Sequence, residues 1–291
     1  MKPKVKSKLN IEQLYQDYLY NCQIKRLKEI RGRDEYREWF GASSAGSCYK
    51  KQYYRTHGYE EKQPDAKATR NMRVGTLVHE DIARAAEEHM LGWEQFANRV
   101  LIEHEITIPK YKVIGHLDLA FISIDDYDVV TAEIHDIKTA HSFKWRKMFG
   151  ILKNRSKNPS KNYEMQLGTY GIGLKGAEDG SSTYNEFDVQ DVRLYLDWIK
   201  KDDGSFKEVQ VNADKYMKKA HEYWQDLNEE LEMVTSPDDM IPTQDIGVPY
   251  YDWECRYCGF AEICNSPLAN KEKDNGNKKA KRRQRTDIRS R

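Results

Sequence analysis

Four cysteines constrain this chain more than any other feature of its sequence. Cys255, Cys258 and Cys264 form a C-x2-C-x5-C cluster near the C-terminus, and Cys48 stands about two hundred positions earlier. Four thiolates are enough to hold an iron–sulfur cluster or a structural zinc ion, and both alternatives are open at this point. A redox C-x-x-C site is disfavoured, because no thioredoxin-type β–α pattern surrounds Cys255. A centre that used all four thiols would fix the two ends of the chain together.

The number of cysteines and the N-terminal sequence indicate the redox environment of the protein. Five cysteines is an odd number, and the basic N-terminus lacks the apolar segment of a secretory signal. These features favour reduced thiols and metal ligation over a disulfide framework. Cys22 has no partner by spacing, so we expect a buried or half-buried thiol there. No apolar run reaches the roughly 18 residues of a membrane span, and no membrane partner is expected.

Hydrophobic periodicity predicts an α/β protein. Apolar residues at helical spacing predict helices at residues 9–40, 74–90, 141–152, 162–175 and 212–232. Segments rich in Val, Ile and Thr predict strands at residues 100–108, 111–124, 128–139, 192–200 and 206–211. This order of elements is typical of a mixed central sheet flanked by helices. Small residues after position 40 end the first helix, which makes residues 1–42 a helical N-terminal segment.

The net charge of +1 conceals a strongly basic C-terminus. Residues 270–291 hold ten Lys/Arg and three Asp/Glu, a charge of +7, so the rest of the chain carries 1 − 7 = −6. A basic segment of this kind indicates contact with a polyanion, and the alternative is a solubilising, disordered tail. We therefore treat residues 267–291 as a basic, disordered tail that follows a domain at 43–266.

Acidic and basic side chains occur where the predicted strands should be buried. Asp118 lies in an apolar strand, and an acid is costly to bury unless something pairs with it. Asp136 and Lys138 lie two positions apart, so strand alternation places both on one face and Glu133 on the other. A carboxylate beside a lysine suits a metal ligand and a cation that stabilises developing charge. The alternative is an ordinary ion pair on one face.

Two further pairs share helix faces. Gly75 precedes His79 by one helical turn, and the glycine would let this helix approach the sheet closely. Gln166 and Tyr170 are also four positions apart. Taken alone, each pair is more typical of packing than of function. A zinc-protease motif is excluded, because Ala83 stands where H-E-x-x-H requires its second histidine.

The motifs together resemble a known family. G-x-x-x-H, G-x-x-D, D-x-K, Q-x-x-x-Y and the cysteine cluster follow one another in order, with one upstream cysteine. Over residues 43–266 this resembles the PD-(D/E)xK nucleases of the RecB type that carry an iron–sulfur cluster. Such domains are found in AddB and in CRISPR-associated spacer-processing nucleases. The resemblance implies a restriction-endonuclease-like core closed by a four-cysteine cluster.

The resemblance also implies roles for single residues. Divalent Mg²⁺ or Mn²⁺ would be held by His79, Asp118, Asp136 and the main-chain carbonyl of Ile137. Lys138 would be the catalytic lysine, with Asp118 and Asp136 as the catalytic acids. Gln166 and Tyr170 would position the substrate or the active site. A 4Fe–4S cluster would be held by Cys48, Cys255, Cys258 and Cys264, which favours iron over zinc.

A basic segment with interleaved aromatic residues lies between Lys138 and Gln166. Residues 141–163 contain seven basic side chains and no acidic one, namely Lys144, Arg146, Lys147, Lys153, Arg155, Lys157 and Lys161. Basic side chains can contact phosphates while aromatic rings stack on bases, so we expect this segment to bind DNA. The alternative is a solvated helix face over aromatic residues of the core.

The predicted function is that of a stand-alone, metal-dependent DNA exonuclease acting on single strands or duplex ends. Its expected setting is DNA processing, recombination or repair in the cytoplasm of a bacterial or phage-infected cell. The chain lacks the G-x4-G-K-[ST] phosphate loop, so a helicase or recombination protein would be a separate partner. The alternatives are a CRISPR spacer-processing nuclease, a non-catalytic DNA-binding or scaffold subunit with the same fold, and a structural zinc protein.

Overall fold

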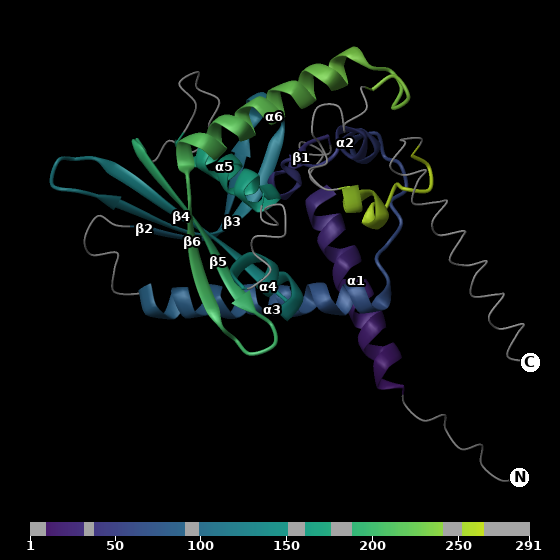
Figure 1. Ribbon diagram of the computed structural model, residues 1–291, viewed down its shortest axis with the longest axis horizontal. Helices are drawn as coiled ribbons and strands as arrows, with labels where there is room; N and C mark the ends of the chain where they lie inside the picture. Colours follow the sequence, from purple (N-terminus) through teal and green to yellow (C-terminus); the bar gives the residue numbers. More distant parts are fainter. Residues whose placement is uncertain are drawn as a thin grey trace, which may run out of the picture.

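The computed structural model describes residues 10–31, 38–90, 99–150, 161–175, 188–240 and 252–264. A mixed six-stranded sheet lies at its centre, with helices on both faces (Figure 1). The predicted fold class is thereby confirmed. No helix in these ranges combines the length and the apolar composition that a membrane span requires.

The sheet combines antiparallel and parallel pairs. Its strands are β1 (Phe40–Gly41), β2 (Arg99–Ile108), β3 (Val113–Ile124), β4 (Val130–Ala140), β5 (Asp191–Lys200) and β6 (Phe206–Val211). The order is β1-β3-β4-β5-β6, and β2 also pairs with β3. The β3–β4 and β5–β6 pairs are antiparallel, whereas β4 and β5 are parallel and are joined by a helical crossover. β4 is therefore hydrogen-bonded along both edges, which makes this strand suitable for a rigid site.

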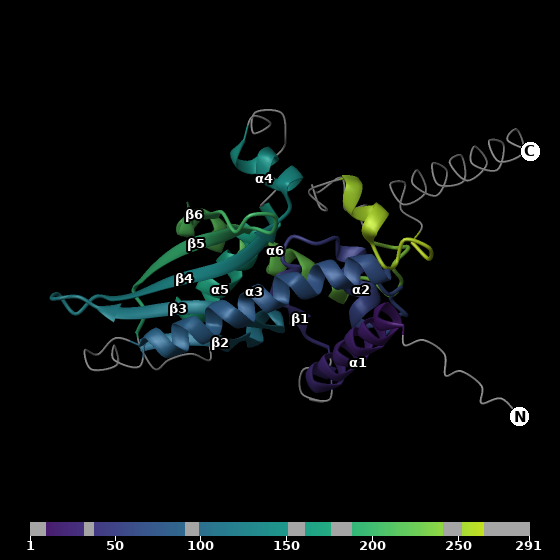
Figure 2. The same ribbon diagram turned by 90° about the horizontal axis from the view of Figure 1, so that it is seen from below.

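Helices cover the two faces of the sheet unequally. They are α1 (Ile11–Arg31), α2 (Tyr49–Thr56), α3 (Ala66–Met90), α4 (Ser142–Phe149), α5 (Lys161–Lys175) and α6 (Ala213–Met233). Helices α5 and α6 lie on one face and α3 crosses the other (Figures 1 and 2). A Cβ at Gly168 would lie 2.2 Å from the carbonyl oxygen of Tyr216, so α5 and α6 can approach this closely only with glycine there.

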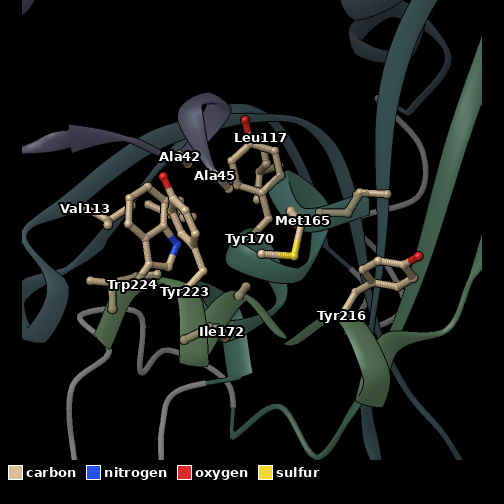
Figure 3. Packing of buried hydrophobic residues seen from close by; sticks show 14 of the residues in the cluster. Ala42, Ala45, Val113, Leu117, Met165, Tyr170, Ile172, Tyr216, Tyr223 and Trp224 are labelled. Carbon is tan, nitrogen blue, oxygen red and sulfur yellow. The ribbon is translucent and has the colours of Figure 1, made fainter. Parts of the chain in front are cut away.

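The main core lies between α5, α6 and the sheet (Figure 3). Leu117, Met165, Tyr170 and Trp224 are all buried there. The indole N–H of Trp224 donates to Oγ1 of Thr169 at 2.9 Å, which satisfies the one polar atom of this large side chain. Helix α5 is therefore held firmly, and the polar side chains that it carries toward β4 are held with it.

The N-terminal region differs from the prediction in three ways. Phe40 was expected in a helix, but it lies in β1, parallel to β3, and its ring stacks on Trp224 at 5.8 Å. Burial of this ring and pairing with β3 outweigh local helix propensity. Helix α3 begins at Ala66, before the predicted residue 74, and Asp65 accepts a hydrogen bond from the main-chain N–H of Ala68. Helix α2 was not predicted.

Helix α1 confirms the predicted helical N-terminus, but its cysteine is not buried. Cys22 is exposed. The helix packs on α3, where Glu12 pairs with Arg70 at 3.2 Å, and it leaves much of its own surface to solvent. The expectation of a buried Cys22 was therefore wrong. The basic tail at 267–291 lies outside the described residues.

Candidate active site

Two acidic residues on adjacent strands form the centre of the site. Asp118 on β3 is 9% exposed and Asp136 on β4 is fully buried. Oδ2 of Asp118 accepts a hydrogen bond of 2.6 Å from the main-chain N–H of Ile137. Burial, together with the charge of Asp118, raises the pKa of Asp136 to about 7, although Lys138 opposes this shift. The two carboxylates therefore repel each other in a place with little solvent.

Lys138 is the cation that faces this charge. Its Nζ lies 2.6 Å from Oδ2 of Asp136, as strand alternation predicted for these two side chains. Burial disfavours the charged ammonium, but the carboxylates of Asp136 and Asp118 outweigh burial and raise the pKa of Lys138. Glu133 points the other way and pairs with Arg193 at 2.9 Å. Lys138 is therefore a protonated, oriented ammonium beside the acids.

Helix α5 supports Asp136 from the other side. Nε2 of Gln166 lies 3.3 Å from Oδ1 of Asp136 and donates to the Tyr170 hydroxyl at 2.7 Å. That hydroxyl donates to the carbonyl oxygen of His116 on β3 at 2.8 Å. Burial and the charge of Asp136 raise the pKa of Tyr170 well above its ordinary value, so the hydroxyl stays protonated. Gln166 and Tyr170 thus join helix α5 to both acid-bearing strands.

Two glycines allow the neighbouring elements to come this close. A Cβ at Gly75 would lie 3.2 Å from Oγ1 of Thr139, where α3 crosses β4. A Cβ at Gly115 would lie 2.6 Å from Cβ of Ala42 and 3.1 Å from the Tyr170 ring. The glycines of G-x-x-x-H and G-x-x-D are therefore needed for packing around the site rather than for contact with a ligand.

Helix α3 brings His79 to the acids. Its Nδ1 lies 3.3 Å from Oδ1 of Asp118. Burial lowers the pKa of His79, but the hydrogen bond to Asp118 and the charge of this carboxylate outweigh burial, so the net pKa is raised. The structure therefore brings together His79, Asp118, Asp136 and Lys138, which lie on three elements.

Glu103 also joins this group, and the sequence reasoning missed it. One ligand atom each from His79, Glu103 and Asp118 lie within 4.8 Å of one another. Glu103 shares β2 with apolar residues and belongs to none of the motifs noted above. The available signal was a charged residue in the middle of a predicted strand, but Glu105 gives the same signal, so the sequence could not separate the two.

These residues fit a divalent cation. Carboxylate oxygens and an imidazole nitrogen are ligands that Mn²⁺ accepts, and carboxylates also suit Mg²⁺. Asp118 is buried and Glu103 is exposed, so the group lies at the edge of the buried acids and can be reached from solvent. A cation there would be attracted by both carboxylates.

A comparison of sequences identifies the family. A family model described as the PD-(D/E)XK nuclease superfamily matches residues 33–265. The chain belongs to this superfamily. Among solved structures it is similar to one described as "Crystal structure of SSO0001", with 19% sequence identity and a TM-score of 0.42, over 87% of this chain and 96% of that chain. No curated protein matches the sequence. The RecB type of this nuclease stays a prediction.

Part of the basic segment at residues 141–163 lies next to the acidic residues of the site. Nζ of Lys138 and Nζ of Lys144 lie 5.2 Å and 4.4 Å from the centre of the Tyr163 ring, so this ring joins Lys138 to the first turn of α4. Trp145, Phe149 and Tyr163 pack against the core, as the alternative interpretation held. Phe143 is 58% exposed, with Nζ of Lys147 4.8 Å from its ring centre.

The remaining basic residues divide by position. Lys161 lies at the start of α5 and Arg146 in the last turn of α4. Lys153, Arg155 and Lys157 lie outside the described residues. Within the described residues, the basic side chains of this segment therefore lie on α4 and in the first turn of α5.

The cysteine segments of the nuclease lie side by side although they are far apart in sequence. Cys48 precedes α2, and Figures 1 and 2 place residues 252–264 next to that helix. The Tyr54 and Phe260 rings pack with centres 5.3 Å apart. The main-chain N–H of Lys62 donates to the carbonyl oxygen of Gly259 at 3.1 Å. The fold thus brings the upstream cysteine to the C-terminal cluster.

The four thiols influence one another electrostatically. Burial and the charges of Cys48, Cys258 and Cys264 raise the pKa of Cys255 to about 12. The charge of Lys51 acts in the opposite direction on Cys258, where it lowers the pKa of the thiol. In the described part of the chain, no three of these sulfurs lie within 4.8 Å of one another. In a tetrahedral zinc site, Zn–S bonds of about 2.3 Å place sulfurs ~3.8 Å apart. The thiols therefore do not have zinc spacing here, and the 4Fe–4S cluster stays a prediction.

Proposed function

We propose that this nuclease is a metal-dependent DNA exonuclease that hydrolyses phosphodiester bonds in single strands or at DNA ends. The observation that carries the proposal is the joint position of Asp118, Asp136 and Lys138 on two adjacent strands. The main-chain N–H of Ile137 ties Asp118 to β4, and Lys138 pairs with Asp136. A purely structural ion pair would not require a second buried carboxylate beside it, because each buried charge is costly.

The residues of the site have separate tasks in this proposal. A bound Mg²⁺ or Mn²⁺ would act as a Lewis acid on the phosphate and lower the pKa of an attacking water. His79, Asp118, Asp136 and the Ile137 carbonyl would hold it. Lys138, kept protonated by the acids, would stabilise negative charge that develops on the phosphate. Gln166 and Tyr170 would hold Asp136 in place and exclude solvent from its inner side.

The basic side chains of α4 and of the first turn of α5 favour DNA as the substrate. Lys144 and Lys138 both approach the Tyr163 ring, and the exposed Phe143 ring offers a base a stacking partner. Single strands suit such a surface, because stacking requires bases that are not paired. The biological setting proposed is DNA processing, recombination or repair.

The cysteines would hold a 4Fe–4S cluster with a structural role. The cluster would close a loop of about two hundred residues, and closing long loops restricts the unfolded chain strongly. The packing of Tyr54 on Phe260 supports a shared centre, because it holds the segment of Cys48 against the segment of the three other cysteines.

The proposal is tested by cleavage of end-labelled DNA with Mg²⁺ or Mn²⁺, using protein purified without oxygen. Wild-type protein should degrade the DNA, and 5′ and 3′ labels should give the polarity. Lys138→Ala should abolish cleavage, whereas Lys218→Ala, on the exposed surface of α6, should not change it. Equal cleavage by wild type and Lys138→Ala would overturn the assignment of this site, and no cleavage by wild type would overturn the proposed activity.

A further inference from the structure

Glu103 lies directly opposite Asp118 in the sheet. On β2 and β3, Ile102 pairs with Leu119 and His104 pairs with Leu117, so the residues between them face each other across the strands. Side chains directly opposite in an antiparallel pair point to the same side, and like charges there are destabilising. Two carboxylates therefore face each other at this point, and a divalent cation would be attracted by both.

The backbone at Glu103 departs from strand geometry. Its φ angle is +45°, in the left-handed region that residues other than glycine rarely adopt. Regular pairing holds on both sides of Glu103 and Asp118, so the register does not shift at this point. Strained residues of this kind persist where the surrounding structure requires them, often at functional sites. At this distorted residue the Glu103 carboxylate lies close to Asp118 and His79.

We propose that Glu103 is a direct ligand of the divalent cation, together with His79 and Asp118. This inference rests on the proposed function and adds a residue that no motif contains. The three side chains come from α3, β2 and β3, and their ligand atoms lie within 4.8 Å of one another. A cation at this point would have carboxylate ligands from two strands and an imidazole ligand from α3.

Asp136 lies outside this group of three, and its contacts explain why. Its Oδ1 faces Gln166 and its Oδ2 faces Lys138. Asp118 stands between the two sets, with Oδ1 toward His79 and Oδ2 bound to the N–H of Ile137. Glu103 therefore supplies the second carboxylate on the His79 side of Asp118, where Asp136 does not reach in this arrangement.

The experiment compares Mn²⁺ binding by metal-free protein using calorimetry. Glu103→Gln keeps the length of the side chain and removes its charge. Glu105→Gln is the matched control, because Glu105 lies two positions further along β2 and faces His116 at 3.4 Å. Glu103→Gln should weaken Mn²⁺ binding at least ~10-fold, which is the loss expected for a metal ligand or for a residue that orients one. Glu105→Gln should bind Mn²⁺ as wild type does.

Thermal unfolding supplies a readout that separates a ligand from a structural residue. Without metal, Glu103→Gln should unfold at the same temperature as wild type, because Glu103 is exposed and the substitution keeps the length of the side chain. Mn²⁺ at one fixed concentration should raise the unfolding temperature of wild type and Glu105→Gln more than that of Glu103→Gln. Unchanged Mn²⁺ affinity in Glu103→Gln, or a lower metal-free unfolding temperature with normal affinity, would overturn the proposal.

The same proteins distinguish this inference from the proposed function. If wild type cleaves DNA and Glu103→Gln binds Mn²⁺ normally, the nuclease assignment holds and the role of Glu103 is wrong. If wild type does not cleave DNA but loses Mn²⁺ binding on Glu103→Gln substitution, the cation site holds and the proposed activity is wrong.

Discussion

Oδ2 of Asp118 accepts a hydrogen bond of 2.6 Å from the main-chain N–H of Ile137. The regular pairing of β3 with β4 ends at Leu119 and His135, so this side chain continues the connection between the strands where the main chain no longer does. One carboxylate thereby has two roles. It holds β3 to β4, and it presents its other oxygen, Oδ1, to His79 at 3.3 Å.

The two roles of Asp118 can be separated by two substitutions. Asp118→Asn keeps an oxygen that can accept from Ile137, so stability should remain close to wild type while metal binding and DNA cleavage are lost. Asp118→Ala leaves that buried N–H without a partner and should cost a further ~1–3 kcal/mol in the free energy of unfolding. Urea denaturation of both variants checks this. Equal stability of the two would show that the hydrogen bond contributes nothing.

Tyr170→Phe should affect both stability and rate. The substitution removes the hydroxyl that joins Gln166 to the carbonyl oxygen of His116, so two partly or fully buried polar groups lose their partner. We expect a loss of about 1–3 kcal/mol in unfolding free energy. Initial cleavage rates should fall roughly tenfold, because residues that orient a metal ligand have effects of this size. Tyr127→Phe, at a tyrosine that is 86% exposed, should change neither quantity. A normal rate in Tyr170→Phe would exclude a positioning role.

Metal binding should strengthen as the pH rises. The pKa of Asp136 is raised to about 7, and Asp118 raises the pKa of His79. Below these values both groups hold protons that a cation must displace, whereas above them no proton is released. Mn²⁺ affinity should therefore increase between about pH 6 and pH 8 and then level off. Calorimetry in buffers of different ionisation enthalpy would count the released protons. An affinity that is constant over this range would contradict the prediction.

Lys144 should contribute to DNA binding through a phosphate. Lys144→Gln keeps most of the contact with Tyr163 while removing the charge, and the salt dependence of single-strand binding should then decrease. The slope of log affinity against log salt should lose about 0.7, the value for one phosphate contact on a single strand. Fluorescence anisotropy at several salt concentrations measures this slope. Lys218→Gln serves as the control on α6, and the same slope for both variants would place the DNA elsewhere.

Cys258→Ala should remove the proposed cluster and most of the folded protein. Cys258 lies in the segment that packs on α2, and burial, together with the charges of Cys48 and Cys264, raises its pKa. Without a cation these thiols contribute no attraction between the two segments. Iron and sulfide analysis, together with thermal unfolding, should show a loss in Cys258→Ala. Cys22→Ser, at the exposed cysteine on α1, should retain iron, sulfide and stability. Full stability of Cys258→Ala would contradict a structural cluster, and zinc without sulfide in wild type would favour the other metal.

Local periodicity made part of the site predictable. A period of two along β4 placed Asp136 and Lys138 on one face and Glu133 on the other, and the structure has them so. A spacing of four placed Gln166 beside Tyr170 on α5, where the two side chains are hydrogen-bonded. These relationships depend on neighbouring residues in the chain, so they follow from the sequence alone.

The tertiary structure decided the contacts between distant segments. Strand register between β2 and β3 placed Glu103, rather than Glu105, opposite Asp118, and register is a property of two strands that no single segment contains. Phe40 lies in a strand rather than in the predicted helix, because pairing with β3 and packing on Trp224 are available only in the folded chain. The sequence by itself determined most of the strand and helix pattern, and which nearby side chains share one face of a strand or helix. Register and burial, which depend on residues far apart in the chain, decided which acids meet His79.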